Sequence, residues 1–199
     1  MHIALFTRVF PPQIGGMERF AFDLAHWLAK HGHRVTVVGP PTCAGADGPL
    51  PFELIRGASA EAAVRLLQNA DVVHLNGLTL RGELAAALGA RRPCITHQGY
   101  QAVCARGLAW SPNGKCTSTA RLPGSCDACP GVRPVNVATV TAHRAGAWWA
   151  SRNICISHFQ MERIQVPRAC VIPNPVGPQA FAAHAPGPGE NNLVAFAGR

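Results

Sequence analysis

Four cysteines in the middle of the chain have a spacing that suits metal binding. They form the set C-x11-C-x9-C-x2-C, made of Cys104, Cys116, Cys126 and Cys129. Four thiolates hold a zinc ion tetrahedrally and leave it no open position, so we expect a structural zinc that orders its loop and does not catalyse. The spacing leaves disulfides, free thiols and an iron–sulfur cluster open as alternatives.

Two adjacent glycines near the N-terminus suggest a second kind of chemistry. Gly15 and Gly16 follow an apolar segment and precede a helical pattern. Backbone N–H groups and the helix dipole favour a phosphate at such a helix start, although a plain tight turn would need the same residues. The patterns G-x-G-x-x-G, G-x-x-x-x-G-K-[ST] and G-x-S-x-G are absent from the sequence. Their absence disfavours nicotinamide-binding, P-loop and serine-hydrolase functions.

Apolar strand patterns and helical patterns alternate along the chain, which predicts a parallel sheet. We expect strands at 2–7, 34–39, 52–55, 72–75, 94–96, 153–156 and 170–172. We expect helices at 17–31, 60–69, 82–88, 135–150 and 160–164. The apolar face predicted for the first helix contains Met17, Phe20, Leu24, Trp27 and Leu28. The fold class is therefore α/β, a Rossmann-like doubly wound parallel sheet in which a Cys-rich loop insertion occupies 98–133.

The end of the chain differs in composition from the rest. Residues 173–192 contain five prolines, which is typical of a linker, and 193–199 read LVAFAGR, like the first strand of another unit. We therefore expect one domain over 1–172, a Pro-rich linker over 173–192, and a truncated first strand of a second domain over 193–199.

The charge balance points to an anionic partner. Lys and Arg total 18 against 10 acidic residues, a net charge of +8, and all but two of the cations are arginines. The cations are scattered and no basic run is interleaved with aromatics, which disfavours a nucleic-acid partner. The sequence has no apolar run long enough to span a membrane and its start is too short for a signal peptide. We expect a cytoplasmic chain, with peripheral contact at the inner membrane face as a further hypothesis.

The stretch 10–39, FPPQIGGMERFAFDLAHWLAKHGHRVTVVG, resembles the amino-terminal signature of retaining glycosyltransferase family 4. The similarity consists of a P-P-x-x-G-G-x-E loop, a helix with L-A-x-x-L, and the strand G-H-x-V-T-V. Further similar segments are DVVHL at 71–75, Thr96-His97, CISHF at 155–159, VIPNPV at 171–176 and FAGR at 196–199. The resemblance therefore extends over nearly the whole chain.

The resemblance implies a GT-B enzyme, in which an acceptor-side domain and a donor-binding domain face each other across a cleft. This chain would be the acceptor-side domain, acting on a nucleotide-sugar donor without a divalent metal. The family's E-x7-E element belongs to the donor-binding domain, which this sequence lacks. We therefore expect a fragment, or a partner polypeptide that carries the missing carboxy-terminal half, and no activity from the chain alone.

The resemblance also implies roles for particular residues. Gly15 and Gly16 would approach the donor diphosphate, and His97 would be the catalytic residue that lines the cleft beside the transferred sugar. His74 and Asn76 would contact the acceptor, although many relatives carry a histidine where this chain has Asn76. The family motif also contains Glu18, for which we expect a supporting role in the loop and the first helical turn.

Two functions follow from the sequence. The first is the acceptor-side domain of a hexosyltransferase-type glycosyltransferase, which moves a sugar from a nucleotide-sugar to a carbohydrate or lipid-linked acceptor. The alternative is a non-catalytic module that binds a sugar or a partner through a fold with a zinc-ordered loop.

Overall fold

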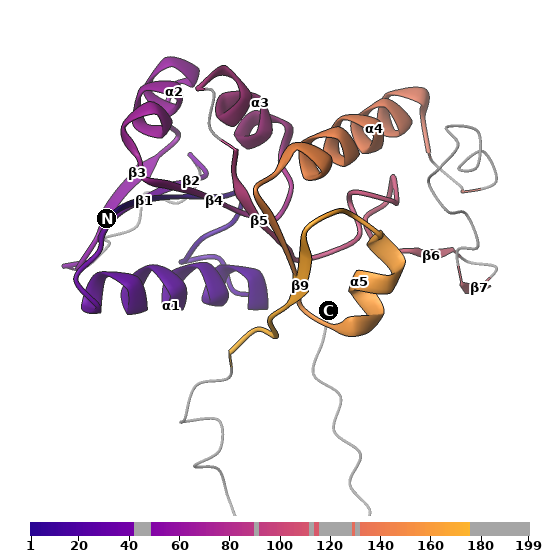
Figure 1. Cartoon of the computed structure of the whole chain (residues 1–199), viewed down its shortest axis with the longest axis horizontal. Helices are drawn as coiled ribbons and strands as arrows, with labels where there is room; N and C mark the ends of the chain where they lie inside the picture. The colour runs from indigo at the N-terminus through magenta and orange to yellow at the C-terminus, as the bar shows by residue number, and fades with distance from the viewer. Residues whose placement is uncertain (42–48, 90–91, 112–113, 116–128, 130–131, 176–199) are drawn as a thin grey trace, which may run out of the picture.

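A seven-stranded parallel sheet forms the centre of the protein (Figure 1). The computed structural model describes residues 1–41, 49–89, 92–111, 114–115, 129 and 132–175. Within these residues the strands are β1 (His2–Thr7), β2 (Arg34–Gly39), β3 (Glu53–Arg56), β4 (Val72–Asn76), β5 (Cys94–His97), β8 (Arg152–Cys155) and β9 (Ala169–Val171). Their order across the sheet is β3-β2-β1-β4-β5-β8-β9, and every neighbouring pair is parallel.

Helices cover both faces of this sheet, which confirms the predicted doubly wound α/β fold. They are α1 (Gly16–Lys30), α2 (Ala60–Asn69), α3 (Leu80–Leu88), α4 (Pro134–Trp149) and α5 (His158–Ile164). Figure 1 shows α1 and α5 on one face and α2, α3 and α4 on the other. Helix α3 begins earlier than predicted because the Thr79 hydroxyl caps it, accepting a hydrogen bond of 3.1 Å from the Gly82 backbone N–H.

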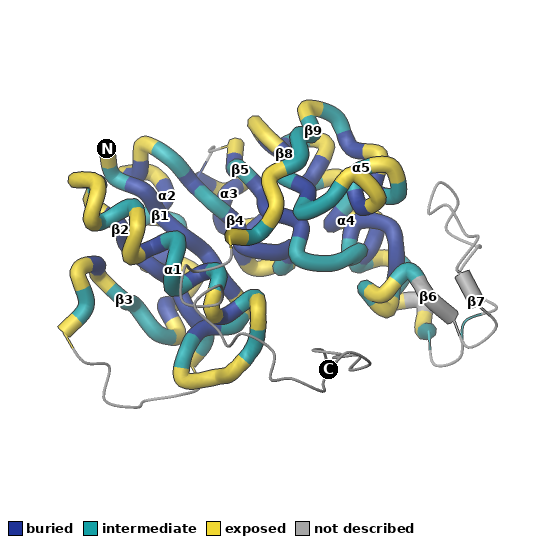
Figure 2. Tube along the Cα trace, turned by 90° about the horizontal axis from the view of Figure 1, so that it is seen from below, coloured by how far each residue is buried: buried dark blue, intermediate teal, exposed yellow. Residues whose placement is uncertain are grey.

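Two apolar layers hold the helices to the sheet. The layer under α1 contains Leu5, Phe10 and Val37, and a larger layer under α2, α3 and α4 contains Val73, Leu75 and Ile95. In Figure 2 the central strands β1 and β4 run through the part of the trace coloured as buried. Strands buried on both faces are typical of parallel sheets, and they place the carboxyl ends of β1 and β4 at fixed positions.

The face that α1 buries differs from the prediction. Ala21 and Ala25 are fully buried against the sheet, whereas Trp27 is 56% exposed and stacks on His31 with 3.8 Å between ring centroids. The two alanines lie one turn apart, and their small side chains let the helix approach the strands closely. The large apolar residues therefore flank the contact, and the sequence pattern overestimated their burial.

Part of the predicted insertion is regular. Residues Trp110–Ser111 (β6) and Gly114–Lys115 (β7) form a short antiparallel pair, which the sequence pattern did not predict. The structure does not describe residues 176–199. Most of the linker predicted at 173–192 and the whole strand predicted at 193–199 therefore lie outside the described residues.

Candidate functional site

The order of the strands reverses between β1 and β4. The chain runs outward from β1 to β2 and β3 on one side, and from β4 to β5, β8 and β9 on the other. In open α/β sheets ligands bind at such a reversal, in the crevice outside the carboxyl ends of the strands. Thr7, Asn76 and Thr96 lie there in register on β1, β4 and β5. This edge is the candidate functional site.

Asn76 ties three segments together at this edge. Its side-chain Nδ2 donates to the Thr7 hydroxyl at 3.3 Å and to the Met17 carbonyl at 3.1 Å, and its Oδ1 accepts from Gln98 Nε2 at 3.0 Å. Asn76 is fully buried. Its side chain therefore fixes the start of α1 and the residue after β5 relative to β4, and the acceptor contact expected for Asn76 stays a prediction.

Gln98 extends this arrangement to the segment after β9. Asn174 Nδ2 donates to Gln98 Oε1 at 3.0 Å, and Gln98 Nε2 lies 3.4 Å from Asn174 Oδ1. A reciprocal amide pair of this kind satisfies a donor and an acceptor on each side chain. The residues that follow the last strand are thereby held at the carboxyl edge of the sheet.

His74 lies on the same face of the sheet as Asn76. Its Nε2 is 2.8 Å from the Thr96 hydroxyl. Burial disfavours the charged imidazolium and lowers the pKa of His74 to about 4. The ring is therefore neutral at pH 7, so His74 carries no positive charge that could attract an anionic ligand.

His97 has a defined tautomer. Asn153 Nδ2 donates to the carbonyls of Ala147 at 2.9 Å and Pro167 at 2.8 Å, so Asn153 Oδ1 is the atom that faces His97 Nε2 at 2.8 Å. An amide oxygen only accepts, so His97 Nε2 carries the proton. Burial lowers the pKa of His97, and the neutral ring is 1% exposed. Among the described residues, its buried Nδ1 has no hydrogen-bond partner.

The sequence-predicted residues divide between the two faces of the sheet. Thr96 and His97 are neighbours in β5, and successive side chains of a strand point to opposite faces. Thr96 contacts His74, whereas His97 is bonded to Asn153, which in turn binds a carbonyl of α4. The structure brings Asn76 and His74 to one face and places His97 on the other.

The predicted glycine loop lies at the open part of the edge. Gly15 precedes α1 in an extended conformation, and Gly16 is exposed with open space where a Cβ would lie. Glu18 is buried in the first turn of α1, where a carboxylate suits the helix dipole. Nearby, Gly77 has a φ of +80°, and a Cβ there would lie 2.6 Å from Met17 Cε. Only glycine fits at that crossing of β4 and α1 without a shift.

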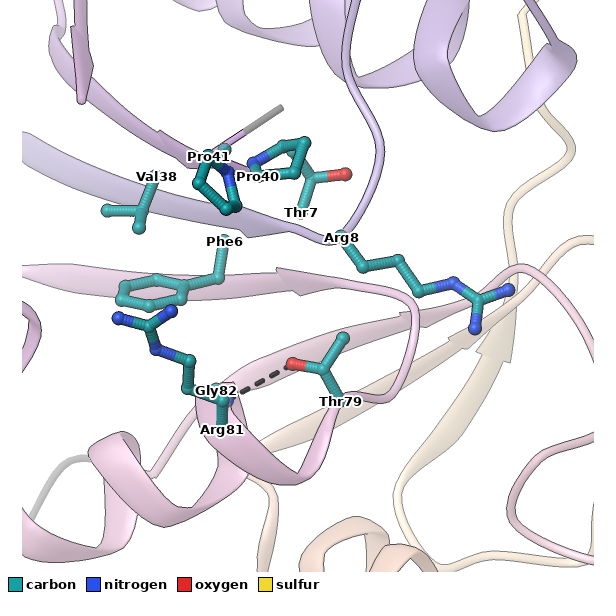
Figure 3. Close-up of a pocket in the computed structure, with 10 residues that line it drawn as sticks. Phe6, Thr7, Arg8, Val38, Pro40, Pro41, Thr79, Arg81 and Gly82 are labelled. Carbon is teal, nitrogen blue, oxygen red and sulfur yellow. Dashed lines mark hydrogen bonds between the residues drawn. The ribbon is translucent and has the colours of Figure 1, made fainter. Parts of the chain in front are cut away.

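Two cavities that were not predicted from the sequence open at the carboxyl ends of the strands. One has a volume of about 220 Å³ and is walled by Phe6, Val38, Pro40 and Pro41, with Arg81 beside the Phe6 ring (Figure 3). The other, of about 230 Å³, lies between α4 and the loop at 101–107. Arg8 lines both. The sequence could have indicated Arg8 as a site residue, because a residue that directly follows the first strand lies at the carboxyl edge of the sheet.

The four-cysteine set is only partly within the described residues. Cys116 and Cys126 lie outside them, and Cys104 is 7% exposed. Over the described part of the chain, no three His, Cys, Asp or Glu side chains form a group that could hold a metal ion. The zinc site stays a prediction.

Comparisons with known proteins give a family match and similar folds. The model of Glycosyltransferase Family 4 matches residues 14–112. The crystal structure of LpCGTa in complex with UDP is similar over 88% of this chain and 53% of that chain, with 14% identity and a TM-score of 0.55. The glycotransferase of kitacinnamycin is similar over 94% and 55% of the two chains, with 16% identity and a TM-score of 0.47. No curated protein matches the chain.

The chain shares its α/β fold with LpCGTa and spans about half the length of these two solved structures. The matched family segment contains the glycine loop, β4 and β5, so it covers most of the candidate site.

Proposed function

We propose that this chain is the acceptor-side module of a retaining glycosyltransferase that uses a nucleotide-sugar donor. In such a transfer the bond from the anomeric carbon to the diphosphate breaks, and the oxygen of an acceptor hydroxyl, on a carbohydrate or a lipid-linked molecule, forms the new bond to that carbon. The proton of the hydroxyl passes to the departing diphosphate or to water. The diphosphate leaves with the bonding electrons, and stabilising its charge is a major part of catalysis.

The open glycine loop at the strand reversal carries this proposal. Gly16 leaves free space in front of the start of α1, and Asn76 holds that start in place through the Met17 carbonyl. A helix start with accessible backbone N–H groups suits a diphosphate. The family match over 14–112 supports the same role for the loop.

A donor-binding domain outside residues 1–199 would supply the nucleotide contacts. The chain spans about half the length of the two similar structures, which supports this division. The Gln98–Asn174 pair would then anchor the start of the interdomain linker beside the acceptor. His97 would touch the transferred sugar only after the groups that cover it move, because its ring is 1% exposed.

Replacing Gly16 by alanine tests the donor role of the loop. The added methyl group meets no protein atom and alanine favours a helix, so we expect an unchanged or slightly higher Tm. The methyl group would occupy the space that the diphosphate needs, so we expect sugar transfer to fall at least about tenfold, as for the loss of about 1.4 kcal/mol of transition-state stabilisation. Transfer of a radiolabelled sugar by the chain reconstituted with its donor-binding half measures this effect.

Ala62→Gly is the control, because residue 62 is exposed on α2, away from the loop. It should lower the Tm slightly and leave transfer unchanged. Transfer by Gly16→Ala at the wild-type rate would remove the diphosphate from this position.

The alternative function is a non-catalytic binding module with a zinc-ordered loop. Metal analysis of protein purified without chelator should give about one zinc per chain, and Cys126→Ser with Cys129→Ser should remove it. A fully folded protein without metal would contradict the zinc site. Transfer by the reconstituted protein would contradict the non-catalytic alternative.

None of the helices in the described residues is long and apolar enough to cross a membrane. Peripheral contact with an acidic membrane face stays a hypothesis, favoured by the exposed Leu80, Leu84 and Leu88 along α3. Flotation of the protein with anionic vesicles would show such contact, and its absence at low salt would exclude it.

A further inference from the structure

We propose that the cavity between α4 and the loop at 101–107 binds a phosphoryl group, held between Arg8 and Arg106. The identification of the bound molecule as the acceptor rests on the proposed function, whereas the site itself does not. The acceptor would then be a phosphorylated carbohydrate or lipid.

The walls of this cavity come from three separate parts of the chain. Arg8 follows β1, Gln101 and Arg106 belong to the loop after β5, and Asn136, Thr139 and His143 lie on α4. None of the described residues that line it is acidic. Two arginines and several neutral hydrogen-bonding groups therefore line the cavity, which is the composition that suits an oxyanion.

Both arginines are free to bind a ligand. Arg8 and Arg106 are exposed, and over the described part of the chain neither has an ion pair or a hydrogen bond. In Figure 3 the Arg8 side chain extends away from Phe6 and the two prolines of the neighbouring cavity. A guanidinium matches two oxygens of a phosphate at once, so an arginine pair at one cavity favours this group.

The α4 side of the cavity adds two polar groups. His143 Nδ1 is 2.5 Å from Glu83 Oε2, and both side chains are less than a tenth exposed. Because a carboxylate accepts, Nδ1 carries the proton, and the other ring nitrogen can accept a hydrogen bond from a hydroxyl group of the ligand rather than from a phosphate oxygen. Asn136 uses its Oδ1 to accept from the Arg133 backbone N–H, which leaves its Nδ2 as a donor in the first turn of α4. The dipole of that 16-residue helix also favours an anion there.

The size of the cavity limits what enters it. Its volume of about 230 Å³ is below the roughly 300 Å³ at which pockets begin to enclose a drug-sized ligand. A phosphoryl group and the first atoms attached to it would fit. The rest of the acceptor would extend along the carboxyl edge, where Arg8 connects this cavity to the apolar one beside Phe6.

Titration of the full chain with sn-glycerol 3-phosphate by NMR and calorimetry tests the site. We expect saturable binding, with amide shifts concentrated at 101–107 and 136–143. Arg8→Gln and Arg106→Gln should each raise the Kd about tenfold or more, without a change in Tm. Arg34→Gln is the matched control, since Arg34 is exposed at the start of β2, at the opposite edge of the sheet, and should leave the Kd unchanged.

Equal losses in all three variants would show attraction to the net charge only and would overturn the site. Absence of binding by the folded wild-type chain would overturn it as well. If phosphate binds as expected but the reconstituted protein transfers no sugar, the proposed function fails and the site stands. If Arg8→Gln and Arg106→Gln leave transfer to the natural acceptor unchanged, the assignment to the acceptor fails and the transferase function stands.

Discussion

Replacing Asn153 by alanine is expected to lower the free energy of unfolding by about 3 to 5 kcal/mol. The substitution removes the partners of the His97 Nε2–H and of the Ala147 and Pro167 carbonyls in a buried region. Each buried group left unpaired costs about 1 to 3 kcal/mol, and the three losses in one network do not simply add. Ala147 is close to the end of α4, so the loss also weakens that end of the helix. Urea unfolding followed by circular dichroism measures the change.

Asn69→Ala makes the same chemical change at an exposed position on α2 and should cost less than about 0.5 kcal/mol. Asn153→Asp keeps an acceptor for His97 but lacks the N–H donors, so it should destabilise strongly as well. A loss below about 1 kcal/mol in Asn153→Ala would contradict the network, and the fixed tautomer of His97 with it.

Lowering the pH from 6.5 toward 4 is expected to destabilise the protein through its buried histidines. Burial lowers the pKa of His74 from 6.5 to about 4, so the unfolded chain binds a proton near pH 6 that the folded chain does not. The stabilising effect is complete above pH 6.5 and is lost as the pH falls toward 4. At 1.36 kcal/mol for each pKa unit, the loss amounts to about 3 kcal/mol. His97, whose pKa is also lowered, acts in the same direction.

Urea unfolding at pH 7.5, 6, 5 and 4 measures this dependence. His74→Gln should remove the part of this dependence that comes from His74, about 3 kcal/mol, and leave the part that comes from His97, even if the variant is less stable at pH 7.5. The control His158→Gln changes an exposed histidine and should leave the slope unchanged. A wild-type free energy of unfolding that stays constant from pH 7 to pH 4.5 would contradict the burial of both rings in the folded state.

The elements of the sheet could be predicted closely because local signals agree at each of them. The strand at 34–39 and the helix at 60–69 have the predicted bounds, since glycine, proline or a serine cap marks their ends. The buried face of α1 was mispredicted because alanine gives a weak hydrophobic signal although it packs closely. The antiparallel pair β6 and β7 was missed because two-residue strands leave no periodic pattern.

The candidate site was predictable only where it depends on local sequence. The glycine loop and the strand ends follow from order and spacing along the chain. The His143–Glu83 and Gln98–Asn174 pairs join residues 60 and 76 positions apart, and no pattern in one sequence specifies such partners. The opposite faces of His97 and Thr96 follow from strand alternation, but which face meets which helix depends on the assembled sheet.

Transfer of a radiolabelled sugar from its nucleotide to an acceptor tests the central claim most directly. The reaction is run with residues 1–199 alone and with the chain joined to a donor-binding domain from a continuing or adjacent reading frame. We expect no transfer by the chain alone and transfer by the joined protein. Turnover by residues 1–199 alone, or a folded joined protein that transfers no sugar from any nucleotide donor, would contradict the assignment of this chain as the acceptor half of a glycosyltransferase.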